Sequence, residues 1–203
     1  MFKKDLVPGA KSKVKSSAQR GIRSQVIETY PKLEPYIDEI IPKKSQLDLM
    51  KLYSYLLPLS LQPPIQEFLL TPGSPDRISL YLLDSQPLFW QHMDDAIVPH
   101  LKVVHQYPQC FPTVGIDRGA IRFVLSGANL AAPGLTSAGG RLPEKDAALK
   151  EGTVVAIMAE GKEEACLVGP LTMGTEEIKE KKKGIVMDGG HYLGDGLWKM
   201  VID

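Results

Sequence analysis

Prolines divide the first quarter of this chain into short helical segments. A helix is predicted from about residue 14 to residue 30, because an apolar side chain recurs at every fourth position, at Val14, Ala18, Ile22, Val26 and Tyr30. Pro31 ends this helix, since proline has no amide hydrogen and disfavours the α conformation in the residue before it. A second short amphipathic helix ends at Pro42, and its apolar side chains are Leu33, Tyr36, Ile37, Ile40 and Ile41. Two helices this short need another layer against which to bury their apolar faces.

That other layer is predicted to be a small sheet. Four segments have the composition of strands: Leu47–Leu52, Arg77–Leu83, Leu88–Gln91 and Leu101–His105. Asp84-Ser85-Gln86-Pro87 is typical of a hairpin turn between the second and the third of them. We therefore expect residues 1–110 to form an α/β domain with two helices on a small sheet.

The segment Tyr53–Asp76 does not fit this pattern. It contains five prolines, no lysine or arginine, and many leucines. Prolines at this density exclude a long helix or a central strand, but the segment is too apolar for a typical disordered linker. We interpret it as an insertion in the N-terminal domain.

A second domain is predicted from residue 111 to residue 203. Its expected elements are a helix at Gly119–Ser126, a strand at Thr153–Ala159, a strand at Glu164–Val168, a charged helix at Thr175–Lys182 and a strand at Gly184–Met187. Several short strands with glycine-rich turns and few helices are typical of a small β-barrel-like domain. The fold class expected for the whole chain is therefore α+β.

The charge of the chain is balanced overall but unevenly distributed. Residues 1–25 carry seven lysines or arginines against Asp5 alone, whereas residues 111–203 carry eleven basic and thirteen acidic residues. A polyanion would therefore meet the basic N-terminal arm first, including Lys11, Lys13 and Lys15; an ordinary solvated basic face is the alternative. No apolar run approaches the ~20 residues that span a bilayer. With only two cysteines, a reduced cytoplasmic protein is expected.

No motif in the sequence demands an enzyme. There is no GxSxG, no HExxH and no Walker loop. The four histidines, His92, His100, His105 and His191, are scattered and lack the spacing of metal ligands. Asp195 is interpreted as a turn residue. We therefore expect no catalytic residue, no metal and no cofactor.

The segment Asp117–Gly140 carries the strongest functional signal. Arg118 lies just before the predicted helix and Arg122 one turn into it, so both lie near its positive N-terminus. Gly134 allows another backbone to approach closely. Short side chains of the kind that contact phosphate and ribose accompany them: Ser126, Asn129 and Ser137.

The same segment also has a purely structural interpretation. Ile121, Val124 and Leu125 would pack the helix into the barrel, and the glycines would only turn the chain. The apolar residues belong to the core in either case, so the arginines and the loop are the candidates for contact with a ligand.

Motifs throughout the chain resemble a known family. DRGAIRFVLSGANLAAPGLTSAG resembles the opening of a PUA domain, a small RNA-binding barrel. Several blocks together resemble the malignant T-cell-amplified sequence proteins, called translation-machinery-associated in fungi: MFKK, QYPQCFPTVGIDRGAIRFVLSGAN, PGLTSAG, VVAIMAEGKEEACLVG, MGTEEI and HYLGDGLW. The resemblance excludes Tyr53–Asp76, which is interpreted as either a lineage-specific loop or an unspliced intron.

The resemblance implies an N-terminal α/β domain before a PUA pseudo-barrel of short strands, and no catalytic activity. It implies binding to the 40S ribosomal subunit together with the density-regulated protein, a partner with an SUI1 domain. The pair releases deacylated tRNA from 40S subunits in recycling and acts in reinitiation. The PUA domain would face RNA at the tRNA acceptor end, with Arg118, Arg122 and Arg141 on phosphates, while the N-terminal domain meets rRNA and the partner. An RNA-binding accessory protein or RNA-modification factor is the alternative.

Overall fold

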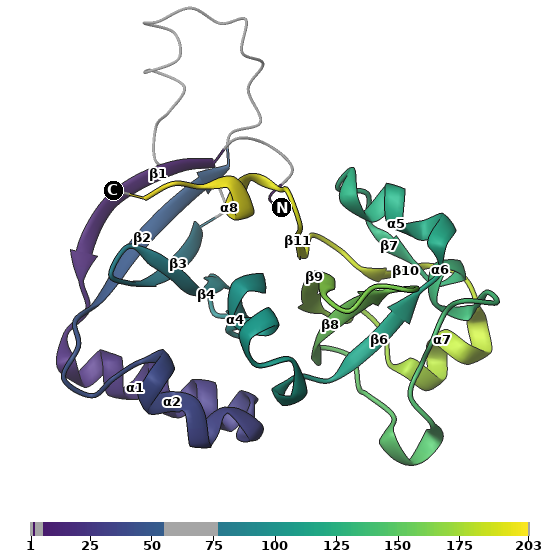
Figure 1. Ribbon diagram of the computed structural model, residues 1–203, viewed down its shortest axis with the longest axis horizontal. Coiled ribbons are helices and arrows are strands. Elements are labelled where there is room, and N and C mark those ends of the chain that lie inside the picture. The colour runs from purple at the N-terminus through teal and green to yellow at the C-terminus, as the bar shows by residue number, and fades with distance from the viewer. Residues whose placement is uncertain (1, 3–5, 55–76, 203) are drawn as a thin grey trace, which may run out of the picture.

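The computed structural model describes residue 2 and residues 6–54 and 77–202, which form two units side by side (Figure 1). The first unit contains β1 (Leu6–Lys13), α1 (Ser16–Thr29), the 3-10 helix η1 (Pro31–Tyr36), α2 (Ile37–Ile40), β2 (Leu47–Ser54), β3 (Arg77–Leu83), β4 (Gln86–His92), β5 (Val98–Pro99), α4 (Leu101–Gln106) and the 3-10 helix η2 (Pro108–Cys110). The second contains β6 (Thr113–Ile116), α5 (Arg118–Leu125), β7 (Leu130–Ala131), α6 (Pro133–Thr136), the 3-10 helix η3 (Lys145–Ala147), β8 (Val154–Ala159), β9 (Ala165–Pro170), α7 (Thr175–Lys181), β10 (Ile185–Met187), β11 (His191–Tyr192) and α8 (Gly196–Lys199). The predicted α+β class is confirmed.

The first unit is built on a five-stranded antiparallel sheet with the strand order β1-β2-β3-β4-β5. The predicted hairpin joins β3 to β4, and its loop is the pair Asp84-Ser85. Both residues have positive φ angles, 49° and 63°, which the tight two-residue turns of hairpins require. The insertion expected at Tyr53–Asp76 lies outside the described residues, apart from the backbone of Tyr53 and Ser54 at the end of β2.

Helix α1 confirms most of the predicted apolar stripe. Ile22, Val26 and Tyr30 are buried, but Ala18 is exposed and Gln19 is buried beside it, with 6% of its surface exposed. The Gln19 side chain donates to the carbonyl of Ser45 at 3.0 Å and accepts from the amide of Leu47 at 3.2 Å. A buried polar side chain is tolerated where it is hydrogen-bonded in this way, so α1 is fixed to the loop before β2.

The prediction of a strand at Leu101–His105 is wrong, because these residues form α4. The adjacent Val103 and Val104 favoured a strand by composition. The helix begins because the Nδ1 atom of His100 accepts from the amide of Lys102 at 3.1 Å, in the manner of an N-cap. Leu101, Val103 and Val104 are then buried on one side of it.

The basic N-terminal arm is also revised by the structure. Residues 6–13 form β1, an edge strand paired with β2, rather than a separate arm. Arg23, which the sequence placed with this basic region, has only 11% of its side chain exposed. Its guanidinium donates to the carbonyls of Ile37 and Ile41 and to Asp38 at 2.6 Å, so it joins α1 to α2.

The second unit contains a four-stranded sheet with the order β11-β9-β8-β6 and a small sheet that pairs β10 with β7. Strands β6 and β8 run parallel, and the other pairs are antiparallel. The helices and strands expected in this half are present, with ends that differ by one or two residues.

Strand β8 lies between two hydrophobic cores. Val154 and Ala156 pack into the core of the first unit, whereas Val155, Ile157 and Ala159 pack into the core of the second. This division follows from the strand's period of two, which sends successive side chains to opposite faces. Both faces of the strand are therefore covered.

The end of the chain returns from the second unit to the first. Leu197 of α8 is fully buried in the first core, and the amide of Gly196 donates to the carbonyl of Phe2 at 3.0 Å. Asp195 is buried and accepts from the amide of Trp198 at 2.8 Å and from His191 Nδ1 at 2.8 Å. The predicted turn residue is therefore also the N-cap of α8.

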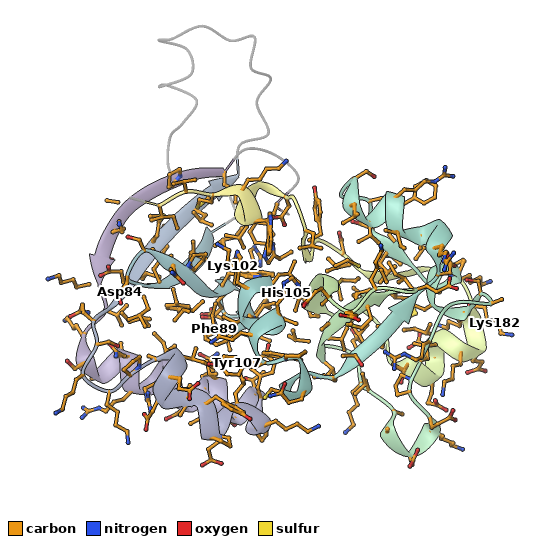
Figure 2. All side chains as sticks on the ribbon, viewed as in Figure 1. Asp84, Phe89, Lys102, His105, Tyr107 and Lys182 are labelled. Carbon is orange, nitrogen blue, oxygen red and sulfur yellow. The ribbon has the colours of Figure 1, made fainter. Side chains whose placement is uncertain are left out.

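A group of buried rings stands at this junction. The ring of His191 lies 4.4 Å from that of His100, centroid to centroid, and both residues are fully buried. His105 of α4 is partly buried and lies between the two units (Figure 2), where its Nε2 donates to the carbonyl of Ala165 at 2.8 Å. Lys102 Nζ lies 6.0 Å from the ring of Trp198. These contacts fix the two units relative to each other.

Candidate nucleic-acid interface

The segment singled out by its sequence begins with a firmly capped helix. The Asp117 carboxylate accepts from the amide of Ala120 at 2.8 Å, which makes Asp117 the N-cap of α5. The Ser137 hydroxyl donates to the other oxygen of the same carboxylate. These hydrogen bonds, that from Ser137 foremost, hold the pKa of Asp117 below its usual range. The carboxylate therefore ties the loop after α6 to the start of α5.

Gly134 brings α6 close to α5. Its carbonyl accepts from the amide of Asp117 at 2.9 Å, and a Cβ atom at Gly134 would lie 2.9 Å from the Cβ of Ala120. A larger residue would force the two segments apart. Gly134 is buried, so its part in the site is to set the spacing between these segments.

Between α5 and the segment of β7 and α6 there is an open groove of about 510 Å³. Its lining is mostly apolar and includes Phe123, Ala131 and Pro133, with Asn129, Ser137 and Arg122 among its polar residues. A volume of this size falls in the range of small-molecule sites, roughly 300–1,000 Å³. The groove can hold a flat apolar group edged by hydrogen-bonding atoms.

Phe123 is the most distinctive residue of the groove. Its side chain is 53% exposed, which is unusual for a large aromatic residue in a folded domain. The guanidinium carbon of Arg122 lies 4.7 Å from the centroid of its ring, within the range of a cation–π contact. The two residues form an exposed ledge that carries both a π face and a positive charge.

Arg118 lies at the first turn of α5 and is 78% exposed. Its Nε lies 3.9 Å from Glu160, and its backbone amide donates to the same carboxylate at 3.1 Å. Because both charges face solvent, this contact leaves the guanidinium accessible. Ser126, at the other end of the helix, is exposed and donates to the carbonyl of Phe123 at 2.8 Å.

Arg141 does not join the other arginines. It lies in a bridge with Gly115 and lines a separate cavity of about 120 Å³ together with Glu163 and Glu164. The three lysines predicted for RNA contact lie in the other unit. Lys11 and Lys13 are on β1 and Lys15 precedes α1, at the opposite end of the molecule from α5 (Figure 1).

The sequence pattern does not predict the part that two residues of the groove play. It indicates Asp117 only as the start of the segment, whereas the structure shows that its carboxylate holds the segment together. Phe123 is not among the predicted candidates, and Leu125, expected in the core, is 41% exposed. Phe123 falls off the apolar stripe of α5, and an aromatic residue on the polar side of a helix is the signal that could have identified it.

Comparisons with known proteins agree with this description. A model of the Pre-PUA-like domain matches residues 2–108, and a model of the PUA domain matches residues 112–193. "Translation machinery-associated protein 20" of Saccharomyces cerevisiae is 45% identical over 194 residues, which cover 96% of this chain and 94% of that protein. "Malignant T-cell-amplified sequence 1 homolog" of Drosophila melanogaster is 44% identical over 186 residues, covering 92% of this chain and 88% of that protein.

Solved structures show the same fold at low sequence identity. A hypothetical protein from Pyrococcus horikoshii is 18% identical with a TM-score of 0.64, covering 94% of this chain and 98% of that one. A conserved PUA domain protein from Thermoplasma acidophilum is also 18% identical, with a TM-score of 0.56 and the same coverage.

In the described ranges, no helix is both long and apolar enough to cross a membrane.

Proposed function

This chain belongs to the family of the translation machinery-associated and malignant T-cell-amplified sequence proteins, so its role is an RNA-binding one connected with translation, and we propose that the groove on α5 holds the unpaired end of an RNA. The observation that carries this proposal is the ledge of Phe123 and Arg122 beside the groove. An unpaired base can stack on an aromatic ring or on a guanidinium plane, whereas a base in a duplex is covered by its neighbours.

The polar groups around the ledge suit the rest of a nucleotide. Arg122 and the exposed Arg118 supply positive charge for phosphates near the start of α5. Asn129 and Ser137 line the groove with a side-chain amide and a hydroxyl, which can bond a ribose hydroxyl or a base edge. Stacking and phosphate contact give affinity with little preference for sequence.

The RNA end that best fits this groove is the acceptor end of tRNA, which is single-stranded. We propose that the protein binds the 40S subunit with a density-regulated partner that carries an SUI1 domain, and that the pair releases deacylated tRNA in recycling and acts in reinitiation. Since 40S subunits are recycled in the cytosol, this proposal also implies that the protein acts there. In this proposal the groove serves binding rather than catalysis. Its carboxylate, Asp117, is occupied by hydrogen bonds from the amide of Ala120 and from the hydroxyl of Ser137, which position α5.

Sedimentation with 40S subunits tests this function. The purified protein is centrifuged with subunits that carry deacylated tRNA, with and without the density-regulated partner, at two salt concentrations. We expect partner-dependent association and release of tRNA, weaker at the higher salt. No association at either salt would overturn the proposal.

Variants of the groove test which residues are responsible. Phe123→Ala removes the exposed ring and Arg122→Ala the charge above it, and each is expected to weaken binding of the tRNA end by about tenfold, since a base–aromatic stack contributes ~1–3 kcal/mol. Lys150→Ala is the matched control, because Lys150 is an exposed cation of the same unit outside the groove. Equal binding by all three variants would contradict the assignment of the groove.

A further inference from the structure

Another cavity lies in the first unit, where α1 begins. It has a volume of about 350 Å³ and is lined by residues from the first two turns of α1 and by Lys43, Ser45 and Gln46. All the side chains that line it are polar or basic, and its cations are Arg20, Arg23 and Lys43. No acidic or apolar side chain of the described residues lines this cavity.

Hydrogen bonds hold the walls of this cavity in place. The buried Gln19 bonds the carbonyl of Ser45 and the amide of Leu47, and Gln46 donates to the carbonyl of Val14 at 2.9 Å. Ser45 donates to the carbonyl of Pro42 at 2.8 Å. The two walls are therefore joined to each other before any ligand arrives, which lowers the entropic cost of binding.

The three cations differ in how far they are already paired. Arg23 is committed to the carbonyls of α2 and to Asp38, and Lys43 Nζ lies 3.5 Å from the same carboxylate with 75% of its side chain exposed. Arg20 is exposed and forms no ion pair with any residue that the structure describes. Asp38 therefore pairs with two of the three cations, and the cavity keeps an excess of positive charge.

The start of α1 adds to this excess. The residue at its N-cap position is Lys15, whose side chain makes no capping hydrogen bond, and the first turn contains no acidic residue. The first amides of a helix have no partner within the helix, and their dipoles favour an anion. Hydroxyls, amides, ammonium and guanidinium groups converge here, and all of them can donate to phosphate oxygens.

We propose that this cavity binds a phosphate of an RNA backbone and forms a second RNA contact, which rests on the proposed function of the chain as an RNA-binding protein. Its lining contains no aromatic side chain on which a base could stack, so the contact is to the backbone and independent of sequence. The start of α1, which lines the cavity, and α5, which lines the groove, lie toward opposite ends of the longest axis of the molecule (Figure 1). A folded RNA surface, not one short strand, can occupy both.

Fluorescence anisotropy with two RNA probes separates the two contacts. A blunt-ended RNA hairpin offers backbone without an unpaired end, and the same hairpin with a single-stranded 3′ overhang offers both. For the variant Arg20→Gln/Lys43→Gln we expect the Kd of the blunt hairpin to rise about tenfold and the slope of log K against log salt to fall by about 1–2. Both side chains are exposed, so the fold is retained.

The control Lys145→Gln/Lys150→Gln removes the same charge from exposed lysines of the second unit. If it weakens binding of the blunt hairpin as much as Arg20→Gln/Lys43→Gln does, the effect is one of net charge and the proposed site is wrong. Loss of overhang binding in Phe123→Ala with unchanged binding in Arg20→Gln/Lys43→Gln would refute the cavity while supporting the groove. A glutamate decapeptide that binds the cavity more tightly than the hairpin would assign it to an acidic protein segment and overturn the assignment to RNA.

Discussion

Acidification is expected to weaken this fold through one buried ring, that of His100. Burial, together with the nearby His191 and Lys102, lowers the pKa of His100 from its usual 6.5 to about 2. The ring is fully buried at the junction of the two units, and its Nδ1 already accepts from the amide of Lys102. A proton on Nδ1 would destroy that cap and place a charge inside the core.

The size of the effect follows from linkage. His100 stays neutral in the folded chain across the physiological range, whereas in the unfolded chain it takes up a proton below its ordinary pKa of about 6.5. The unfolded state therefore binds more protons as the pH falls, and stability decreases from that pH downward until the folded pKa is reached. Between about pH 7.5 and about pH 5, this one group removes about 2 kcal/mol of stability.

Urea denaturation of the wild type and of His100→Asn over this range isolates the contribution. Asparagine keeps an oxygen that can cap α4 but has no proton to gain. The stability difference between the two proteins should shrink by about 2 kcal/mol on going from about pH 7.5 to about pH 5, because only the wild type carries the histidine. A difference that stays constant would show that His100 is protonated or solvated in the folded state, and the reasoning would fail.

Three further predictions concern packing. Gly134→Ala should cost about 1–3 kcal/mol of stability in urea denaturation, and Ala120→Gly in the same chain should restore part of it, since the two Cβ atoms collide; no rescue would contradict this geometry. Cys166, whose pKa burial raises to about 11, should resist a thiol reagent at neutral pH until the chain is denatured; rapid labelling of the native protein would contradict its burial. Gln19→Ala should cost about 1–3 kcal/mol by leaving the Leu47 amide unpaired, and a neutral result would show that water replaces the side chain.

Local patterns in the sequence predict much of this fold. Pro31 and Pro42 bracket the short helices as expected, and the Asp84-Ser85 turn joins its two strands, because these signals act within a few residues. The strand expected at Leu101–His105 failed for a different reason. Val103 and Val104 favour a strand on their own, but burial against the first core and the cap from His100 select a helix.

The candidate site was predictable only in part. Arg118 and Arg122 lie on α5, and Asn129 follows that helix and lines the groove with Arg122, so a short stretch of sequence was enough to group them. Arg141 follows the same glycine-rich loop but pairs with Gly115 and turns to another cavity. The cavity at α1 unites Arg20 with Lys43 through the contact of two elements, and neither segment alone indicates it.

The alternation of side chains along β8 has a mechanical consequence. Since neighbouring residues of this strand complete different cores, neither unit keeps its packing if the other is lost, and we expect the described parts of the chain to melt in a single transition. The return of α8 to the first unit adds a second attachment. The two units therefore behave as one rigid body and not as two domains on a flexible linker. The distance between the two ends of the molecule is fixed, because both units pack on the same strand.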